Sequence, residues 1–301
     1  MRISTNTLYE LGVSGIQNRM SDLLKTQQQL AAGRRILTPS DDPVGSSQTL
    51  ELNQSLSVTQ QYKANIGHAS SALGLEDSVL AGVTQTIQDA RVVAVNAGNP
   101  TLSSANLQAL AVDLRGRYQQ LLGLANSKDG QGQYMFAGFQ GTTLPFTQTS
   151  GAGVYAGDQG QRNVQISASR QVAISDSGKD IFKPGVTGQD VFQTLDTLIT
   201  QLGTGSITAT QLSTALSGLD SALNNTLRVR ASVGARLREL DATNSTHDET
   251  ALQYQTTISN IQDLDYTKAI TDLTRQQTSL EAAQKSYVSV QQLSLFNYIG
   301  N

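Results

Sequence analysis

The chain has 301 residues, of which 38% are apolar and only 5% aromatic, and it contains no tryptophan. Its 21 basic and 24 acidic residues give a net charge of −3, so it lacks the basic surplus that nucleic-acid binding or adhesion to an anionic membrane needs. With no cysteine, it can form neither disulfides nor thiolate metal sites. The low apolar fraction favours extended helical packing over a large round core.

The N-terminal residues contain no apolar stretch like that of a cleaved signal peptide. No window of the chain approaches the ~20 consecutive apolar residues of a membrane-spanning helix. We therefore expect no membrane insertion. If the protein leaves the cell, we expect it to use a route that reads no cleaved signal.

The first predicted helix covers residues 5–32, and Gly33 is placed to stop it. Steps of 4, 3, 4 and 3 residues join a heptad-like stripe with one polar member: Ile16, Met20, Leu23, Gln27 and Leu30. A second helix start follows, where we expect Asp41 and Asp42 to cap free amides and Pro43 to occupy the first helical position. The helical pattern then runs to about Ala97.

Another helix is expected from Ser103 or Ser104 to a stop at 129–130, as an antiparallel hairpin with its predecessor because the connecting loop is short. Residues 131–188 differ, since Gly, Thr, Ser and Gln dominate and the period falls to two. Alternating Val164, Ile166, Val172 and Ile174 predict a β-hairpin that turns at 167–170. The Gly-rich residues 151–157 are interpreted as a loop.

Helical patterns return at 189–203 and from about 208 to 258. Gly234 lies inside the second of these, where it costs roughly 1 kcal/mol against Ala, and a close backbone contact would explain it. The last helical segment covers about 259–299 and ends in an apolar tip that a soluble monomer rarely exposes.

Each terminal stripe is too narrow to fold alone, so we predict that the two ends pair with each other and with other copies. The predicted subunit-interaction residues are Leu8, Leu11, Ile16, Met20, Leu23, Leu30, Ile270, Leu273, Leu280, Tyr287, Leu293, Leu295, Phe296 and Tyr298. Because helix nucleation is unfavourable, we expect these ends to order fully only on assembly.

The sequence offers no pattern typical of catalysis or of a cofactor site. His68 and His247 lie far apart without a metal-binding spacing, and we interpret both as surface or packing residues. The acidic residues Asp176, Asp263 and Asp265 lack the ligand order of a calcium loop. We expect no enzyme activity, no cofactor and no metal.

The predicted fold is mainly α with a small β-rich insert, as an elongated helical bundle whose terminal helices pair as a coiled coil. Residues 1–35 and 259–301 would form an inner terminal domain, 36–130 and 189–258 a helical rod, and 131–188 a β-rich outer domain.

Several motifs resemble those of bacterial flagellins and the hook-associated proteins related to them. LAAGRRI at 30–36 followed by PSDDP at 39–43 is similar to the flagellin N-terminal motif, although Pro43 stands where flagellins usually have Ala. Further similar segments, which together span nearly the whole chain, are YMFAG at 134–138, YAGDQGQR at 155–162, RASVGARL at 230–237 and SLFNY at 294–298.

The resemblance, with Pro43, points to the members of this family at the hook–filament junction. It implies a structural adaptor layer that is exported unfolded by the flagellar type III machinery to the extracellular flagellum. The implied partners are other copies in a ring or helical layer, hook-associated protein 1, flagellin or the filament cap, and an export chaperone. Two alternatives stay open: a flagellin filament subunit, and a secreted coiled-coil adhesin or effector.

Overall fold

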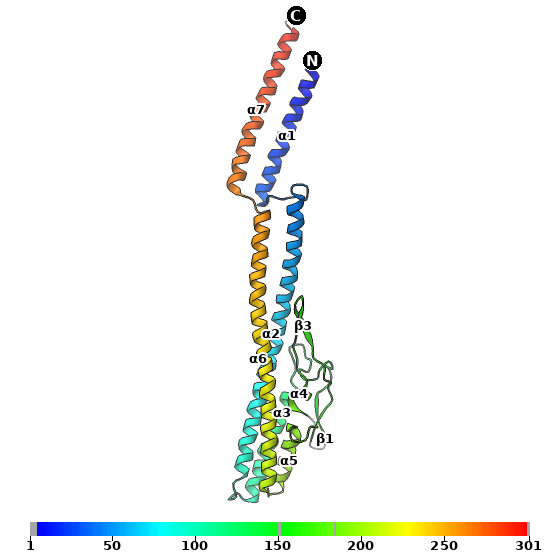
Figure 1. Ribbon diagram of the computed structural model, residues 1–301, viewed down its shortest axis with the longest axis vertical. Helices are drawn as coiled ribbons and strands as arrows, with labels where there is room; N and C mark the ends of the chain where they lie inside the picture. The colour runs from blue at the N-terminus through cyan, green and yellow to red at the C-terminus, as the bar shows by residue number, and fades with distance from the viewer. Residues whose placement is uncertain (1–4, 150–151, 184, 300–301) are drawn as a thin grey trace. The chain divides into compact units, whose positions relative to one another are not determined.

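The structure, a computed structural model, describes residues 5–149, 152–183 and 185–299. Its helices are α1 (Thr5–Ala32), α2 (Pro43–Ala97), α3 (Ser104–Ala125), α4 (Gly178–Phe182), α5 (Val191–Gly203), α6 (Ala209–Gln262) and α7 (Tyr266–Ile299) (Figure 1). Its strands are β1 (Phe146–Thr149), β2 (Ala152–Tyr155), β3 (Asn163–Ser167) and β4 (Arg170–Ala173). The predicted fold class, mainly helical with a small β insert, is confirmed.

The chain divides into two compact units. Residues 1–58 and 250–301 make the first, and residues 59–249 make the second. The long helices α2 and α6 contribute to both. The three-domain division expected from the sequence remains a prediction.

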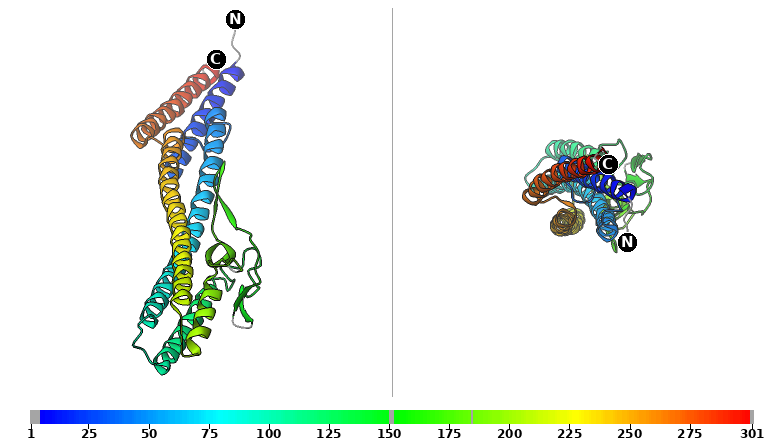
Figure 2. Two further views of the ribbon diagram at one scale, coloured as in Figure 1. Left: turned by 60° about the horizontal axis from the view of Figure 1, so that its bottom comes forward. Right: turned by 90° about the horizontal axis from the view of Figure 1, so that it is seen from above.

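The core of the second unit lies between α2, α3, α5 and α6. The 3-4 stripe of α2 is buried along its length: Leu80, Val83, Ile87, Ala90, Ala94 and Ala97. Helix α3 runs antiparallel to α2, as predicted from the short loop (Figure 2). Arg117 Nη1 lies 3.1 Å from Asp89 Oδ2 across the pair. Small residues along α2 let the helices approach closely, which explains how a chain with few aromatic residues closes this core.

The end of α6 differs from the prediction. Residues 259–262 belong to α6, not to the last helix, and the break falls at 263–265. Asp265 Oδ1 accepts a hydrogen bond from Lys268 N (3.1 Å), so Asp265 is the N-cap of α7. Apolar residues lie on both sides of this point, and no Gly or Pro marks it, so the pattern of the sequence did not locate the break.

The insert contains two antiparallel hairpins. The predicted one is present, with Val164 opposite Val172 in strands β3 and β4. The second was missed, because residues 152–155 form strand β2 beside β1 and not the expected loop. Gly153 explains the mistake: a Cβ there would lie 2.8 Å from Phe192 Cγ, so glycine serves close packing in a strand.

An aromatic cluster joins this part of the insert to α5. Phe146 lies at its centre, with ring centroids 5.1 Å from each of Tyr155, Phe182 and Phe192. All three phenylalanines are fully buried. The five-residue helix α4, which the sequence did not predict, supplies Phe182. Gly234 of α6, by contrast, has no contact within 4 Å of a Cβ among the described residues, so none of them makes the close contact expected to explain it.

Candidate assembly interface

Helices α1 and α7 come from opposite ends of the chain and lie side by side in the first unit (Figures 1 and 2). The Tyr9 and Tyr287 rings meet edge-on, with centroids 6.0 Å apart and planes at 82°. Gly12 makes room for this ring, because a Cβ there would lie 2.8 Å from Tyr287 Cδ2. Further along, Arg19 donates a hydrogen bond to the Ser279 hydroxyl. The predicted pairing of the two ends is confirmed.

The predicted interaction residues differ in how far this pairing covers them. Leu23 is buried, while Ile16, Leu30, Leu273, Leu280 and Tyr287 are half-buried. Three are exposed: Leu11 at 65%, Ile270 at 53% and Met20 at 46%. The side chains of five lie outside the described residues: Leu8, Leu293, Leu295, Phe296 and Tyr298. The intramolecular pair therefore uses only part of the apolar surface on its helices.

More apolar side chains are exposed on the pair than the sequence analysis selected: Val13, Leu24, Val288 and Val290. Among described side chains of α1 and α7, only Leu23, Thr26 and Ala269 are classed as buried. Tyr9 and Gly12 were not among the predicted interaction residues. A glycine in a helix opposite an aromatic residue can indicate a close helix–helix contact. The sequence shows this only once it is known which helices pair.

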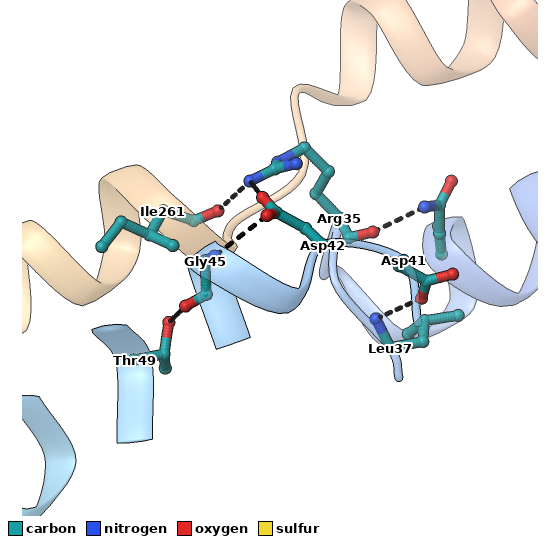
Figure 3. A network of polar contacts seen from close by, with 8 residues as sticks. Arg35, Leu37, Asp41, Asp42, Gly45, Thr49 and Ile261 are labelled. Carbon is teal, nitrogen blue, oxygen red and sulfur yellow. Dashed lines mark hydrogen bonds and ion pairs between the residues drawn. The ribbon is translucent and has the colours of Figure 1, made fainter. Parts of the chain in front are cut away.

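A compact network connects α1 to α2 where α6 passes into α7 (Figure 3). Arg35 is its centre. The guanidinium donates from Nη2 to the Ile261 carbonyl (2.8 Å) and to Asp42 Oδ2 (3.1 Å), and the Arg35 amide donates to the Gln262 carbonyl (2.8 Å). Gln29 Nε2 donates to the Arg35 carbonyl (2.6 Å). Arg35 thus joins the end of α1, the start of α2 and the end of α6. These contacts hold the α1–α2 connection against the α6–α7 connection.

Gly33 lets the chain leave α1 at this point. Its φ of +68° lies in the left-handed region, where residues with a Cβ are strained. A Cβ at Gly33 would also lie 2.8 Å from the Tyr266 hydroxyl. The Gly33 carbonyl accepts a hydrogen bond from Leu264 N (3.1 Å), so the stop of α1 and the break before α7 are tied together.

The predicted capping residues have separate tasks. Asp42 Oδ1 accepts from Gly45 N (2.9 Å), which is the geometry of a helix N-cap, and Pro43 is the first residue of α2. Asp41 does not cap α2. Its Oδ2 accepts from the amides of Leu37 (3.0 Å) and Thr38 (2.9 Å), so it closes the preceding turn, and Oδ1 lies 2.7 Å from Lys25 Nζ.

Both carboxyl groups are stabilised in their charged form. The Lys25 side chain, followed by the amides of Thr38 and Leu37, lowers the pKa of Asp41. The Gly45 amide, followed by the Arg35 guanidinium, lowers the pKa of Asp42. Hydrogen bonds to the carboxylate favour ionisation, so both groups stay charged through the neutral range.

The two histidines lie in the second unit and are not brought together. His247 Nε2 lies 2.7 Å from the Ile166 carbonyl, and its ring stacks on Tyr62. His68 lines a cavity beside α2. Within the described ranges, no group of three or more His, Cys, Asp or Glu side chains is placed to hold a metal ion. Over those same residues, no helix is both long and apolar enough to cross a membrane.

These features define a class of protein: a helical subunit whose two ends pair and still expose apolar side chains to other molecules. Two family models match the chain. The bacterial flagellin N-terminal helical region matches residues 3–141, and the bacterial flagellin C-terminal helical region matches residues 216–299.

Curated relatives narrow the class. The chain is 36% identical to flagellar hook-associated protein 3 of Salmonella typhimurium and 35% identical to that of Escherichia coli, in each case over 98% of this chain and 99% of the relative. The chain therefore belongs to the flagellar hook-associated protein 3 family of flagellin-like proteins. Its function is that of a structural subunit of the bacterial flagellum at the hook–filament junction.

Solved structures support the fold. A putative flagellar hook-associated protein from Vibrio parahaemolyticus has a TM-score of 0.70 at 22% identity, covering 74% of this chain and all of that one. The flagellar junction protein FlgL from Legionella pneumophila has a TM-score of 0.62 at 22% identity, covering 72% of this chain and all of that one.

Proposed function

We propose that the chain forms an adaptor layer that joins hook-associated protein 1 on one side to the flagellin filament, or its cap, on the other. Copies of the chain would associate side by side in a ring or helical layer. The observation that carries this proposal is the unsatisfied apolar surface of the α1–α7 pair, with Leu11, Met20 and Ile270 about half exposed or more. Neighbouring subunits would cover those side chains. Full burial of such a side chain contributes roughly 1.5–3 kcal/mol, and about half of that remains to be gained at each of them.

The same surface suggests that folding of the ends is coupled to assembly. With so few buried side chains, the α1–α7 pair gains little from its own seam, and two helices joined only by a narrow seam are marginal in water. Subunit neighbours supply the missing contacts, so ordering and incorporation would occur together. Strong hydrogen-exchange protection of both ends in the free monomer would contradict this part of the proposal.

We also propose how the protein reaches the flagellum and what kind of role it has there. A chain with weakly stabilised ends suits export in an unfolded state by the flagellar type III machinery, with an export chaperone covering the apolar ends before secretion. The extracellular flagellum is its final location. In this proposal the chain has a mechanical role, and none of its residues performs a catalytic step.

A gene deletion tests the role. We expect electron microscopy of the deletion strain to show hooks without filaments, and the medium to contain monomeric flagellin. Complementation with the full chain restores filaments. Loss of filaments without flagellin in the medium would instead identify a filament subunit. Intact motility, with the protein free in the medium or on host cells, would favour the adhesin or effector alternative.

A further inference from the structure

The β3–β4 hairpin rests on α2 and α6 through polar contacts as well as through the buried side chains of Ile166 and Val172. Asn65 Nδ2 of α2 donates to the Gln165 carbonyl (2.8 Å). His247 Nε2 of α6 lies 2.7 Å from the Ile166 carbonyl. At the turn, Arg170 pairs with Glu239 of α6 through two hydrogen bonds of 2.5 and 3.0 Å.

The base of the hairpin is fastened by three charged groups from three elements. Asp176, just after the hairpin, pairs with Arg236 of α6 and accepts from Gln161 Nε2 at 3.1 Å. The Asp176 amide donates to Glu76 Oε1 of α2 at 3.2 Å. Arg236 Nη1 also donates to the Ala173 carbonyl at 2.9 Å. The cluster therefore links both long helices to the last residues of the hairpin.

This cluster holds more acid than base. Glu76 is only 2% exposed and Asp176 is buried, and Arg236 is the cation that both face. Two ionised carboxylates with one guanidinium leave an uncompensated buried charge, which is costly in a low-dielectric setting. Binding one proton removes that charge. Burial, followed by the Asp176 carboxylate, raises the pKa of Glu76 to about 8.

Other charged groups lie near Glu76 but outside the cluster of Glu76, Asp176 and Arg236. A cavity of about 570 Å³ beside Glu76 is also lined by His68, Asp129 and Arg162. Arg162 Nη1 is turned to Gln133 Oε1 (3.1 Å) and Asp129 (3.7 Å). Asp77, the next residue on α2, is paired with Arg230 of α6 at 3.0 Å.

We propose that Glu76, Asp176 and Arg236 form a proton-dependent latch that holds residues 163–176 on helices α2 and α6. With one proton in the carboxyl pair, the hairpin base is clamped. When that proton is lost, Glu76 and Asp176 repel each other and the hairpin opens. The opening is limited to this segment, because the aromatic cluster around Phe146 independently anchors the β1–β2 part of the insert to α5.

Hydrogen exchange of the full chain, followed by mass spectrometry between pH 5 and 9, tests the latch. A group whose pKa is raised on folding stabilises below its unfolded pKa of 4.5, and that contribution is lost as pH rises towards its folded pKa of about 8. After correction for intrinsic exchange, we expect protection of residues 163–176 to fall by up to about tenfold per pH unit between pH 5 and 8, then level off. Peptides from α3 and α5 should keep their protection.

Variants assign the effect. Glu76→Gln keeps the shape and removes the titration, so protection of the hairpin should become flat with pH. Asp77→Asn, one residue away and outside the cluster, should keep the wild-type slope. Asp176→Asn removes the neighbouring charge, and the fall in protection should move to lower pH. The proposal is overturned if Glu76→Gln keeps the wild-type slope, or if α3 and α5 lose protection in parallel with the hairpin.

Discussion

Asp42 shows how one carboxylate can serve two helices, as the N-cap of α2 and the partner of Arg35, which also contacts the end of α6. We expect Asp42→Ala to lose both functions, so amide exchange should accelerate in the first turn of α2 and at Arg35. Asp42→Asn should keep the cap, because Asn is as good an N-cap as Asp, and should lose only the ion pair. Equal exchange rates in the two variants would contradict this division of roles.

Gly12 is required by the Tyr287 ring, whereas Gly15, one turn later, has no described atom within 4 Å of a Cβ. Gly12→Ala should therefore displace the ring and weaken the α1–α7 pair, even though alanine favours the helix. Gly15→Ala is the matched control, and it should stabilise α1 by about 0.5–1 kcal/mol. Exchange protection of α1 and filament incorporation measure both variants. If Gly12→Ala behaves like Gly15→Ala, the ring contact does not hold the pair.

Among the elements, the aromatic cluster around Phe146 ties the β1–β2 part of the insert to α5. Phe146→Ala should lower the free energy of unfolding of the second unit by about 3–5 kcal/mol, because it leaves a cavity among three rings. Phe139→Ala is the control, since that ring is 69% exposed, and about 1 kcal/mol or less is expected. Urea denaturation of both variants compares the two. Similar losses would mean that the cluster adds no special stability.

The terminal helices should be dispensable for the fold but not for assembly. A chain lacking residues 259–301 keeps the whole core of the unit formed by residues 59–249. We expect circular dichroism to show a cooperatively unfolding helical protein, and we expect no incorporation at the tip of the hook. Its presence in the medium must be verified, so that failed export is not mistaken for failed assembly. Incorporation of the truncated chain would contradict the assigned role of α7.

The elements that the sequence predicted well are those with a long period and a chemical start signal. Helix α2 was predicted at both ends because Asp42 and Pro43 mark its start and a Gly-Asn-Pro run follows its end. The break at 263–265 was missed because no Gly or Pro marks it and apolar residues lie on both sides of the capping residue Asp265. Strand β2 was missed because Gly153 is required by Phe192, a contact between residues distant in sequence.

The candidate interface, like the helices and strands, was predicted only in part. Heptad spacing selected Leu23, Leu273 and Leu280, which are buried or half-buried in the described structure. Leu11 and Ile270 were also predicted, as apolar residues of the terminal segments, and the pair leaves them exposed. A stripe records which residues are apolar, but it does not distinguish those that meet the partner helix from those that face other molecules. The sequence did not identify Arg35 as the centre of the connecting network. Two of its partners are backbone carbonyls, and a backbone group cannot be recognised from the type of side chain.

The whole molecule, in the proposed role, occupies one short layer between hook and filament. Immunogold electron microscopy of intact flagella with an antibody against the chain tests it most directly. We expect label confined to a single zone where the filament begins. Label along the full length of the filament, or flagella without label while the protein is present in the medium, would contradict it.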